Sequence, residues 1–134
     1  MKTIIAGSRS ISLTPEKIDQ ALEEFKRFKI TEVVCGLAPG MDLSGKTWAK
    51  SKGIPVKEFP ADWGKHGKSA GIIRNKQMGD YADALFYVWD GESDGTRHML
   101  KYMNDLGKQT YGYQIMPSGN AISLVSSPTL KELL

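Results

Sequence analysis

The chain has 134 residues, 40% of them hydrophobic and 25% charged, which indicates one globular domain with little room for a second. No stretch reaches the roughly 18 consecutive apolar residues of a membrane span, and the first apolar run is too short for a secretion signal, so we expect a cytoplasmic protein with no membrane partner. The net charge of +3 is scattered along the chain, which disfavours duplex nucleic acid as a partner.

Short apolar runs alternate with helical patterns along most of the chain. In chain order we predict strand 3–6, helix 15–28, strand 31–35, helix 41–52, strand 54–59, helix 71–81, strand 84–89, helix 96–106 and strand 110–115. Thr14 ahead of Pro15 is typical of a helix N-cap, and Gly53 is typical of a helix end. The alternation predicts an α/β fold with a Rossmann-like doubly wound, mainly parallel five-stranded sheet and helices on both faces.

The chain beyond the fifth strand has a weaker pattern. We expect residues 1–116 to form the ligand-binding domain and residues 117–134 to form an extension packed on that same domain. Within the extension, residues 121–125 suggest an edge strand and residues 129–134 a short helix. The single cysteine, Cys35, lies in an apolar run and is expected in the core.

Three loops follow predicted strands and carry glycine with small polar or charged residues, namely 7–10, 36–42 and 90–96. In a parallel sheet the carboxyl ends of the strands meet at one edge, where the next helices begin. Glycine allows close approach of a phosphate, and the free N–H groups of a helix start attract an anion. The three loops therefore favour a ligand site, although tight turns between strands and helices also use these residue types.

Residues 40–47 match the P-loop pattern of nucleotide triphosphatases, and residues 84–90 resemble the apolar strand that ends in a Walker B aspartate. A P-loop should open a helix at its Gly-Lys-Thr. The helix predicted from Met41 instead places residues 45–47 inside the helix. A P-loop NTPase is therefore a minor alternative.

Five motifs follow one another in order: Gly7-Ser8-Arg9, Gly36 to Asp42, Phe59 to Trp63, Gly71 to Met78, and Trp89 to Met99. In combination they resemble the YspA-type branch of the SLOG superfamily, the Rossmann-like group that also holds DprA/Smf and the LOG phosphoribohydrolases. The resemblance spans roughly residues 3–115. It implies a nucleotide or nucleotide-derived ligand, such as an ADP-ribose-like species or a nucleoside monophosphate. One departure is Pro39, which stands where this branch has an arginine that could face the phosphate.

The resemblance to LOG enzymes is partial. Arg74 and Met78 match an Arg and Met of the LOG pattern, and Gly95-Thr96 match its phosphate loop, but the catalytic glutamate position falls on Met99. A methionine cannot transfer a proton or stabilise an oxocarbenium ion. The resemblance therefore favours sensing or sequestering of the ligand. An N-glycosidic or phosphoribosyl hydrolase or transferase remains the alternative, and DprA-like binding of single-stranded DNA is a further one.

From the loops and the resemblance together we predict ligand-binding residues at Gly7, Ser8, Arg9, Gly36, Gly40, Asp42, Trp63, Arg74, Asn75, Asp90, Gly91, Ser93, Gly95 and Thr96. If the protein is an enzyme, the candidate catalytic residues are Arg74, Asp90 and Glu92, with Asp42 and Asp94 as further carboxylates. A surface ion pair with Asp80 is the alternative for Arg74, and a helix N-cap is the alternative for Asp42 and Asp90.

Trp63 is expected to stack on a base or, as loop aromatics often do, to cover the core. The two histidines, His66 and His98, are not spaced as metal ligands, so we expect no metal and no cofactor. By analogy with other small doubly wound domains we expect a homo-oligomer.

Overall fold

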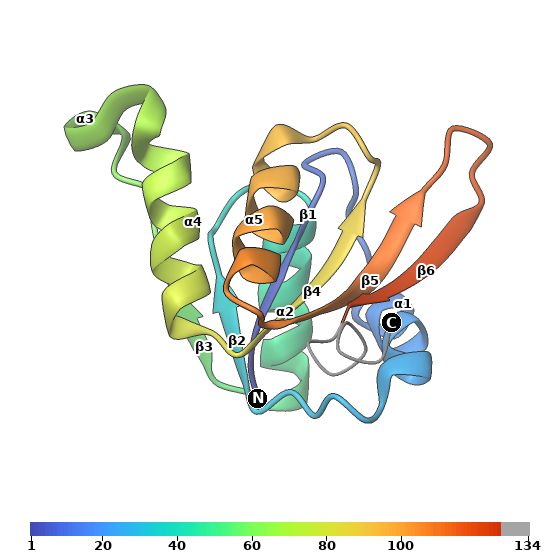
Figure 1. Cartoon of the computed structure of the whole chain (residues 1–134). Helices are drawn as coiled ribbons and strands as arrows, with labels where there is room; N and C mark the ends of the chain where they lie inside the picture. Colours follow the sequence, from blue (N-terminus) through green and yellow to red (C-terminus); the bar gives the residue numbers. More distant parts are fainter. Residues whose placement is uncertain (127–134) are drawn as a thin grey trace.

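A computed structural model describes residues 1–126 as an α/β fold built on one six-stranded sheet (Figure 1). The strands are β1 (Lys2–Gly7), β2 (Glu32–Cys35), β3 (Val56–Glu58), β4 (Ala84–Trp89), β5 (Gln109–Ile115) and β6 (Ala121–Ser126). Their order in the sheet is β3-β2-β1-β4-β5-β6, and the first five strands are parallel. The predicted fold class is confirmed.

The sixth strand extends the predicted five-stranded sheet. β6 pairs antiparallel with β5 in a register that runs from Ile115 opposite Ala121 to Thr110 opposite Ser126. The edge strand suggested for residues 121–125 is therefore present and makes the sheet mixed. The short helix suggested for residues 129–134 lies outside the described residues.

Helices cover both faces of the sheet (Figure 1). They are α1 (Pro15–Leu22), α2 (Met41–Lys52), α3 (Trp63–His66), α4 (Ala70–Tyr81) and α5 (Asp94–Asp105). Along β1, Ile5 packs in the core beneath α1 and α2, whereas Ile4 packs in the core beneath α4 and α5. Phe86 and Leu85 alternate in the same way along β4. Both faces of the central strands are buried, as the apolar runs of the sequence predict for a doubly wound sheet.

The predicted ends of the helices are confirmed in two places. The Thr14 side chain accepts a hydrogen bond of 3.3 Å from the backbone N–H of Lys17, so it is the N-cap of α1. Gly53 ends α2 in the left-handed conformation, with φ of 70°. These local signals act within one turn of chain, which is why they are readable from sequence.

The P-loop interpretation is wrong for this fold, because α2 begins at Met41 and Gly45 lies within it. A Cβ atom on Gly45 would lie 2.6 Å from Cγ2 of Ile5, so this glycine allows α2 to pack closely on β1. Lys46 forms an ion pair of 2.6 Å with Glu58 on β3. The motif residues therefore serve packing and a surface ion pair.

Several segments differ from the predicted elements. The strand predicted at 54–59 forms only over Val56–Glu58. The predicted loop at 60–67 contains the one-turn helix α3, whose N-cap Asp62 accepts a hydrogen bond of 3.0 Å from the N–H of Lys65. The last predicted helix begins two residues earlier, at Asp94. The first ends at Leu22 and continues as a 3₁₀ turn over Glu23–Phe25. No helix in the described part of the chain has the length and apolar character needed to cross a membrane.

Candidate functional site

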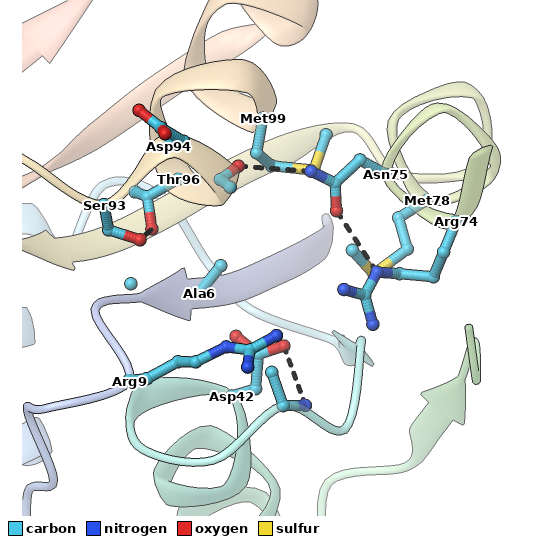
Figure 2. A pocket seen from close by; sticks show the side chains of 13 residues that line it. Ala6, Arg9, Asp42, Arg74, Asn75, Met78, Ser93, Asp94, Thr96 and Met99 are labelled. Atoms are coloured by element: carbon cyan, nitrogen blue, oxygen red, sulfur yellow. Dashed lines mark hydrogen bonds between the residues drawn. The ribbon is translucent and has the colours of Figure 1, made fainter. Parts of the chain in front are cut away.

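A cavity of about 290 Å³ lies at the carboxyl ends of β1 and β4, where the strand order reverses direction (Figure 2). We call it the central cavity. Its lining residues come from the end of β1, from the loops after β1, β2 and β4, and from α2, α4 and α5: Ala6, Gly7, Arg9, Ala38, Asp42, Arg74, Asn75, Met78, Ser93, Asp94, Gly95, Thr96 and Met99. This is the place in a doubly wound sheet where ligands bind.

Two further cavities adjoin the central cavity, and Arg9 and Arg74 line all three. The side cavity, of about 360 Å³, lies toward β2 and is otherwise lined by Gly36, Leu37, Ala38, Pro39, Pro60, Ala61 and Trp63. The outer cavity, of about 220 Å³, lies between the start of α4 and the start of α5 and includes Trp63, Ile72 and His98. The two arginines thus connect three parts of one larger depression.

Arg74 is a buried cation at the centre of this depression. Its guanidinium donates to the carbonyl oxygen of Gly36 through Nη1, and its Nε donates to Oδ1 of Asn75 at 3.2 Å. Gly36 packs directly against the guanidinium, because a Cβ there would lie 2.9 Å from Nη1 of Arg74. The suggested surface ion pair with Asp80 is wrong, since Arg74 is only 9% exposed and Asp80 accepts from the Tyr102 hydroxyl instead.

Burial lowers the pKa of Arg74, while the nearby carboxylate of Asp42 opposes the shift. A guanidinium starts from so high a pKa that it stays charged at neutral pH. The positive charge at this position is therefore permanent. It has been removed from water and only partly neutralised, so it favours an incoming anion.

Asp42 is a buried carboxyl group on the wall of the central cavity, 6% exposed, and its Oδ2 accepts a hydrogen bond of 3.2 Å from the N–H of Ala38. Burial raises the pKa of Asp42 to about 6, against the opposing effects of that hydrogen bond and of the charges of Arg74 and Arg9. Asp42 lies in the first turn of α2, but its hydrogen bond runs back to the preceding loop, and the N-cap position is Gly40. The N-cap alternative for Asp42 is therefore wrong.

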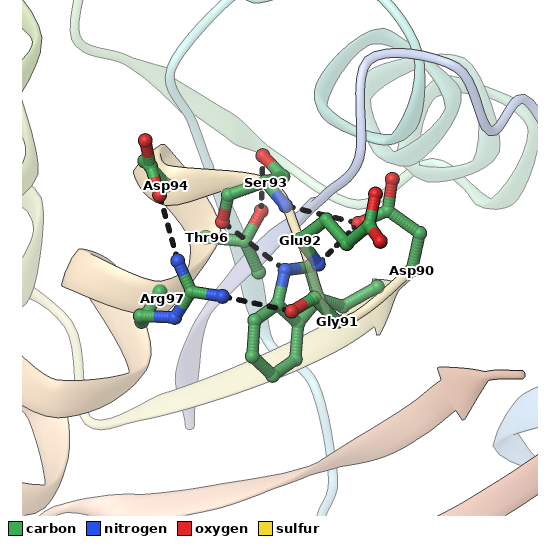
Figure 3. A network of polar contacts seen from close by, with 8 residues as sticks. Asp90, Gly91, Glu92, Ser93, Asp94, Thr96 and Arg97 are labelled. Atoms are coloured by element: carbon green, nitrogen blue, oxygen red, sulfur yellow. Dashed lines mark hydrogen bonds and ion pairs between the residues drawn. The ribbon is translucent and has the colours of Figure 1, made fainter.

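The loop that leads into α5 is held by a network of polar contacts (Figure 3). Asp90 Oδ1 accepts from the N–H groups of Glu92 and Ser93 at 2.8 and 3.0 Å, which lowers the pKa of Asp90. Arg97 donates to the carbonyl of Gly91 at 2.8 Å and to Asp94 at 2.7 Å. The loop is therefore fixed before any ligand arrives.

The first turn of α5 offers backbone donors to the central cavity. Ser93 is the N-cap, and within residues 1–126 its side chain makes no capping hydrogen bond. The first N–H groups of a helix have no partner inside the helix, and the helix dipole adds partial positive charge there. Gly95 and Thr96, which line the cavity, therefore lie at a place suited to a phosphate.

The structure brings most of the predicted ligand-binding residues to one place. The central cavity gathers eight of them: Gly7, Arg9, Asp42, Arg74, Asn75, Ser93, Gly95 and Thr96. The side cavity adds Gly36 and Trp63. Asn75 also has a local role, because its Nδ2 donates to the carbonyl of Gly95 at 3.1 Å and so ties α4 to α5.

The other predicted residues are not among those that line the three cavities. The Oγ of Ser8, which is buried, accepts from the N–H of Asp90 at 2.9 Å and joins the loops after β1 and β4. Gly40 has φ of 80° and packs its Cα against the backbone of Ser8 and Arg9. Asp90 and Gly91 brace the α5 loop, and the exposed Glu92 lies in it.

Sequence reasoning missed part of the cavity wall. Met78 follows Arg74 by four residues and Met99 follows Thr96 by three, so helical spacing places each pair on one face of its helix. That spacing, together with the LOG resemblance that names Met78 and Met99, was the available signal. The methionines are buried and give the cavity an apolar side. Among residues 1–126, no group of three or more His, Cys, Asp and Glu side chains is placed to hold a metal ion, and Cys35 is a free, buried thiol.

Comparison with known proteins agrees with this geometry. Residues 1–66 match the family described as the YspA, cpYpsA-related SLOG family. The chain is also similar to the Gene 61 protein of Mycobacterium phage D29, with 33% identity over 113 residues that cover 79% of this chain and 90% of that protein. Membership indicates, in general terms, a function related to nucleotide-derived ligands. The fold, the motifs and the two matches together show that the chain belongs to the SLOG superfamily.

Proposed function

We propose that this protein binds a nucleotide or nucleotide-derived ligand, such as an ADP-ribose-like species or a nucleoside monophosphate, in the central cavity, and so senses or sequesters it. One observation carries the proposal. The guanidinium groups of Arg9 and Arg74 and the first turn of α5 line the same cavity. Cations and helix N-terminal amides that converge on one cavity recognise the charge and the oxygen atoms of a phosphate.

The hydrogen bonds of Arg74 leave part of its guanidinium for a ligand. Within residues 1–126, Nε and Nη1 donate to Asn75 and Gly36, so Nη2 still has two N–H groups to offer. Arg9 is exposed at the mouth of the three cavities and supplies a second, less constrained fork of donors. The buried Asp42 is a suitable acceptor for ribose hydroxyl groups.

A thermal-shift screen with AMP, ADP-ribose and NAD tests the proposal. Ligand at 100 times its Kd stabilises the native state by about 2.7 kcal/mol, which corresponds to a rise in Tm on the order of 10 °C for a domain of this size. We expect the rise to be lost in Arg9→Ala, an exposed residue whose removal leaves the core intact, and in Arg74→Ala.

Arg27→Ala is the matched control, since it removes the same charge from an exposed arginine that stacks on Phe28, away from the cavities. This variant should respond to ligand like the wild type. An equal loss of response in Arg9→Ala and Arg27→Ala would show that the effect comes from net charge rather than from this site.

Catalysis at an N-glycosidic bond is a second candidate function, and Asp42 is the observation that favours it. A carboxyl group with a pKa of about 6 that lines the cavity is suited to proton transfer near neutral pH. In the hydrolysis of AMP, water would add to the ribose C1′ as the bond to adenine breaks, giving ribose 5-phosphate and adenine. Chromatography of AMP incubated with the protein detects both products, and Asp42→Asn should abolish them. If AMP binds to the protein but is not cleaved, catalysis is ruled out for AMP and only sensing or sequestering remains.

A further inference from the structure

The side cavity differs from the central cavity in the side chains that line it beyond the two shared arginines. Apart from Arg9 and Arg74, its lining side chains are all apolar: Leu37, Ala38, Pro39, Pro60, Ala61 and Trp63. The central cavity shares these two arginines but also holds the carboxyl groups of Asp42 and Asp94 and the start of α5. Ala38 also lines both, so the apolar compartment continues directly from the polar one.

Trp63 is the most unusual residue of this compartment, because 53% of its surface is exposed. Trp48 is 6% exposed and belongs to the core, and Trp89 is partly buried beneath Arg97. An indole is a large apolar surface, and such residues are usually buried on average. Its exposure at the wall of a cavity leaves the indole accessible to a ligand.

The local structure holds Trp63 in place without covering it. Asp62 caps α3, and the carbonyl of Trp63 accepts from the N–H of Gly67 at the end of the same turn. One edge of the indole lies against Gly71, where a Cβ would be 3.5 Å from Cη2. The ring is therefore supported by the start of α4 while it lines the side cavity.

We propose that the side cavity is the base subsite of the ligand, in which the purine or pyrimidine ring lies against Trp63 and faces the Leu37–Pro39 segment. This inference rests on the proposed function and adds the position of the base to it. The phosphate would lie in the central cavity, and the ribose would pass beside Arg9 and Arg74, which line both. The flat apolar faces of a base suit an indole and a proline-containing wall, whereas a sugar or a phosphate does not.

Paired ligands test the subsite. AMP and ADP-ribose carry a base, and ribose 5-phosphate has the same sugar and phosphate without one. We expect AMP to bind the wild type at least 10-fold more tightly than ribose 5-phosphate, because stacking on an aromatic side chain contributes about one to two orders of magnitude in affinity. Trp63→Ala should bind AMP no more tightly than ribose 5-phosphate, with its affinity for ribose 5-phosphate unchanged. Trp63→Phe should retain most of the preference for AMP.

Ile72→Ala is the matched control, because Ile72 is 48% exposed and lines the outer cavity on the other side of Trp63. This variant should keep the wild-type ratio of affinities for AMP and ribose 5-phosphate. The quenching of tryptophan fluorescence by AMP should disappear in Trp63→Phe, which retains Trp48 and Trp89. The Tm of Trp63→Ala without ligand should match the wild type, since the indole is exposed.

Three results would overturn the inference. If the wild type binds AMP and ribose 5-phosphate equally, the phosphate site stands and the base subsite fails. If Ile72→Ala, and not Trp63→Ala, removes the ratio, the base lies in the outer cavity. If neither AMP nor ADP-ribose nor ribose 5-phosphate binds the wild type, the proposed function itself fails and the subsite fails with it.

Discussion

Leu37 has φ of 66°, and it is the non-glycine residue with positive φ among residues 1–126. The left-handed conformation brings a Cβ close to the following carbonyl oxygen, at a cost of about 1–2 kcal/mol. Leu37 lies in the loop after β2 and lines the side cavity. Strained backbone of this kind persists where the surrounding structure holds it, here between Gly36 packed on Arg74 and Gly40 packed on Ser8.

We expect Leu37→Gly to be more stable than Leu37→Ala by about 1 kcal/mol, because only glycine relieves the left-handed strain. Both variants lose the leucine side chain, so the comparison cancels its packing. Urea unfolding of the two proteins measures the difference. Equal stabilities, or a more stable alanine variant, would mean that the backbone at this position is not strained.

Asp42 should make the stability of the protein depend on pH. Its folded pKa of about 6 lies above the unfolded value near 3.8, so the native state binds more protons between these values. The wild type should therefore lose stability as pH rises from 4 to 7, by up to about 3 kcal/mol from this group.

Asp42→Asn keeps an acceptor for the N–H of Ala38 and removes the titration. The free energy of unfolding of Asp42→Asn minus that of the wild type should thus increase between pH 4 and pH 7 and level off above pH 7. Urea unfolding at a series of pH values measures it. Parallel pH profiles would show that Asp42 ionises in the folded protein as it does in water.

The loop between β4 and α5 is the element that positions the first turn of α5 at the central cavity. Asp90 accepts two backbone N–H groups and donates its own N–H to Ser8, so one residue fixes both the start of α5 and the loop after β1. We expect Asp90→Ala to lower the free energy of unfolding by about 1 kcal/mol, the usual cost of losing hydrogen bonds between a side chain and the backbone.

Asp90→Asn retains an acceptor oxygen and should recover most of the loss. Glu92→Ala, in the same loop with an exposed side chain, should change stability by less than about 0.5 kcal/mol. Denaturant unfolding of the three variants checks this. Equal losses for Asp90→Ala and Glu92→Ala would contradict a bracing role for Asp90.

A helix or strand could be predicted where the residues that determine its ends lie close together in the chain. The bounds of α2 were predictable from its residue pattern and from Gly53, because the signal that ends a helix lies next to it in the chain. α3 was missed, since four residues show no helical period and its turn depends on the Asp62 cap. α5 was placed two residues late because Gly95, which sits in its first turn, is typical of loops.

At the scale of the whole molecule, the alternation of strands and helices was enough to predict which edge of the sheet carries the cavities. It was not enough to predict which loop side chains face them. Ser8 and Asp90 bond to the backbone of neighbouring loops, whereas Arg74, far along the chain from both, turns inward to Gly36. The hydrogen-bond partners of these side chains depend on contacts between segments distant in sequence, which a local sequence pattern does not predict.

The position of the cavities in the fold, rather than their size, supports the proposed site. A cavity of about 400 Å³ lies between α1 and α2 and is lined by residues such as Asp19, Phe28 and Trp48. It is larger than the central cavity and lies away from the loops that follow β1, β2 and β4. Arg9, Arg74 and the start of α5 are absent from its lining. We therefore assign the ligand to the sheet edge.

An NMR titration tests this assignment most directly. In ¹H–¹⁵N spectra of the full chain titrated with ADP-ribose, we expect the largest shifts at the amides of Arg9, Ala38, Gly95 and Thr96, with little change around Asp19 and Phe28. Shifts that cluster around Asp19 and Phe28, or an unchanged spectrum at millimolar ligand, would contradict the central claim that this sheet edge binds a nucleotide-derived ligand.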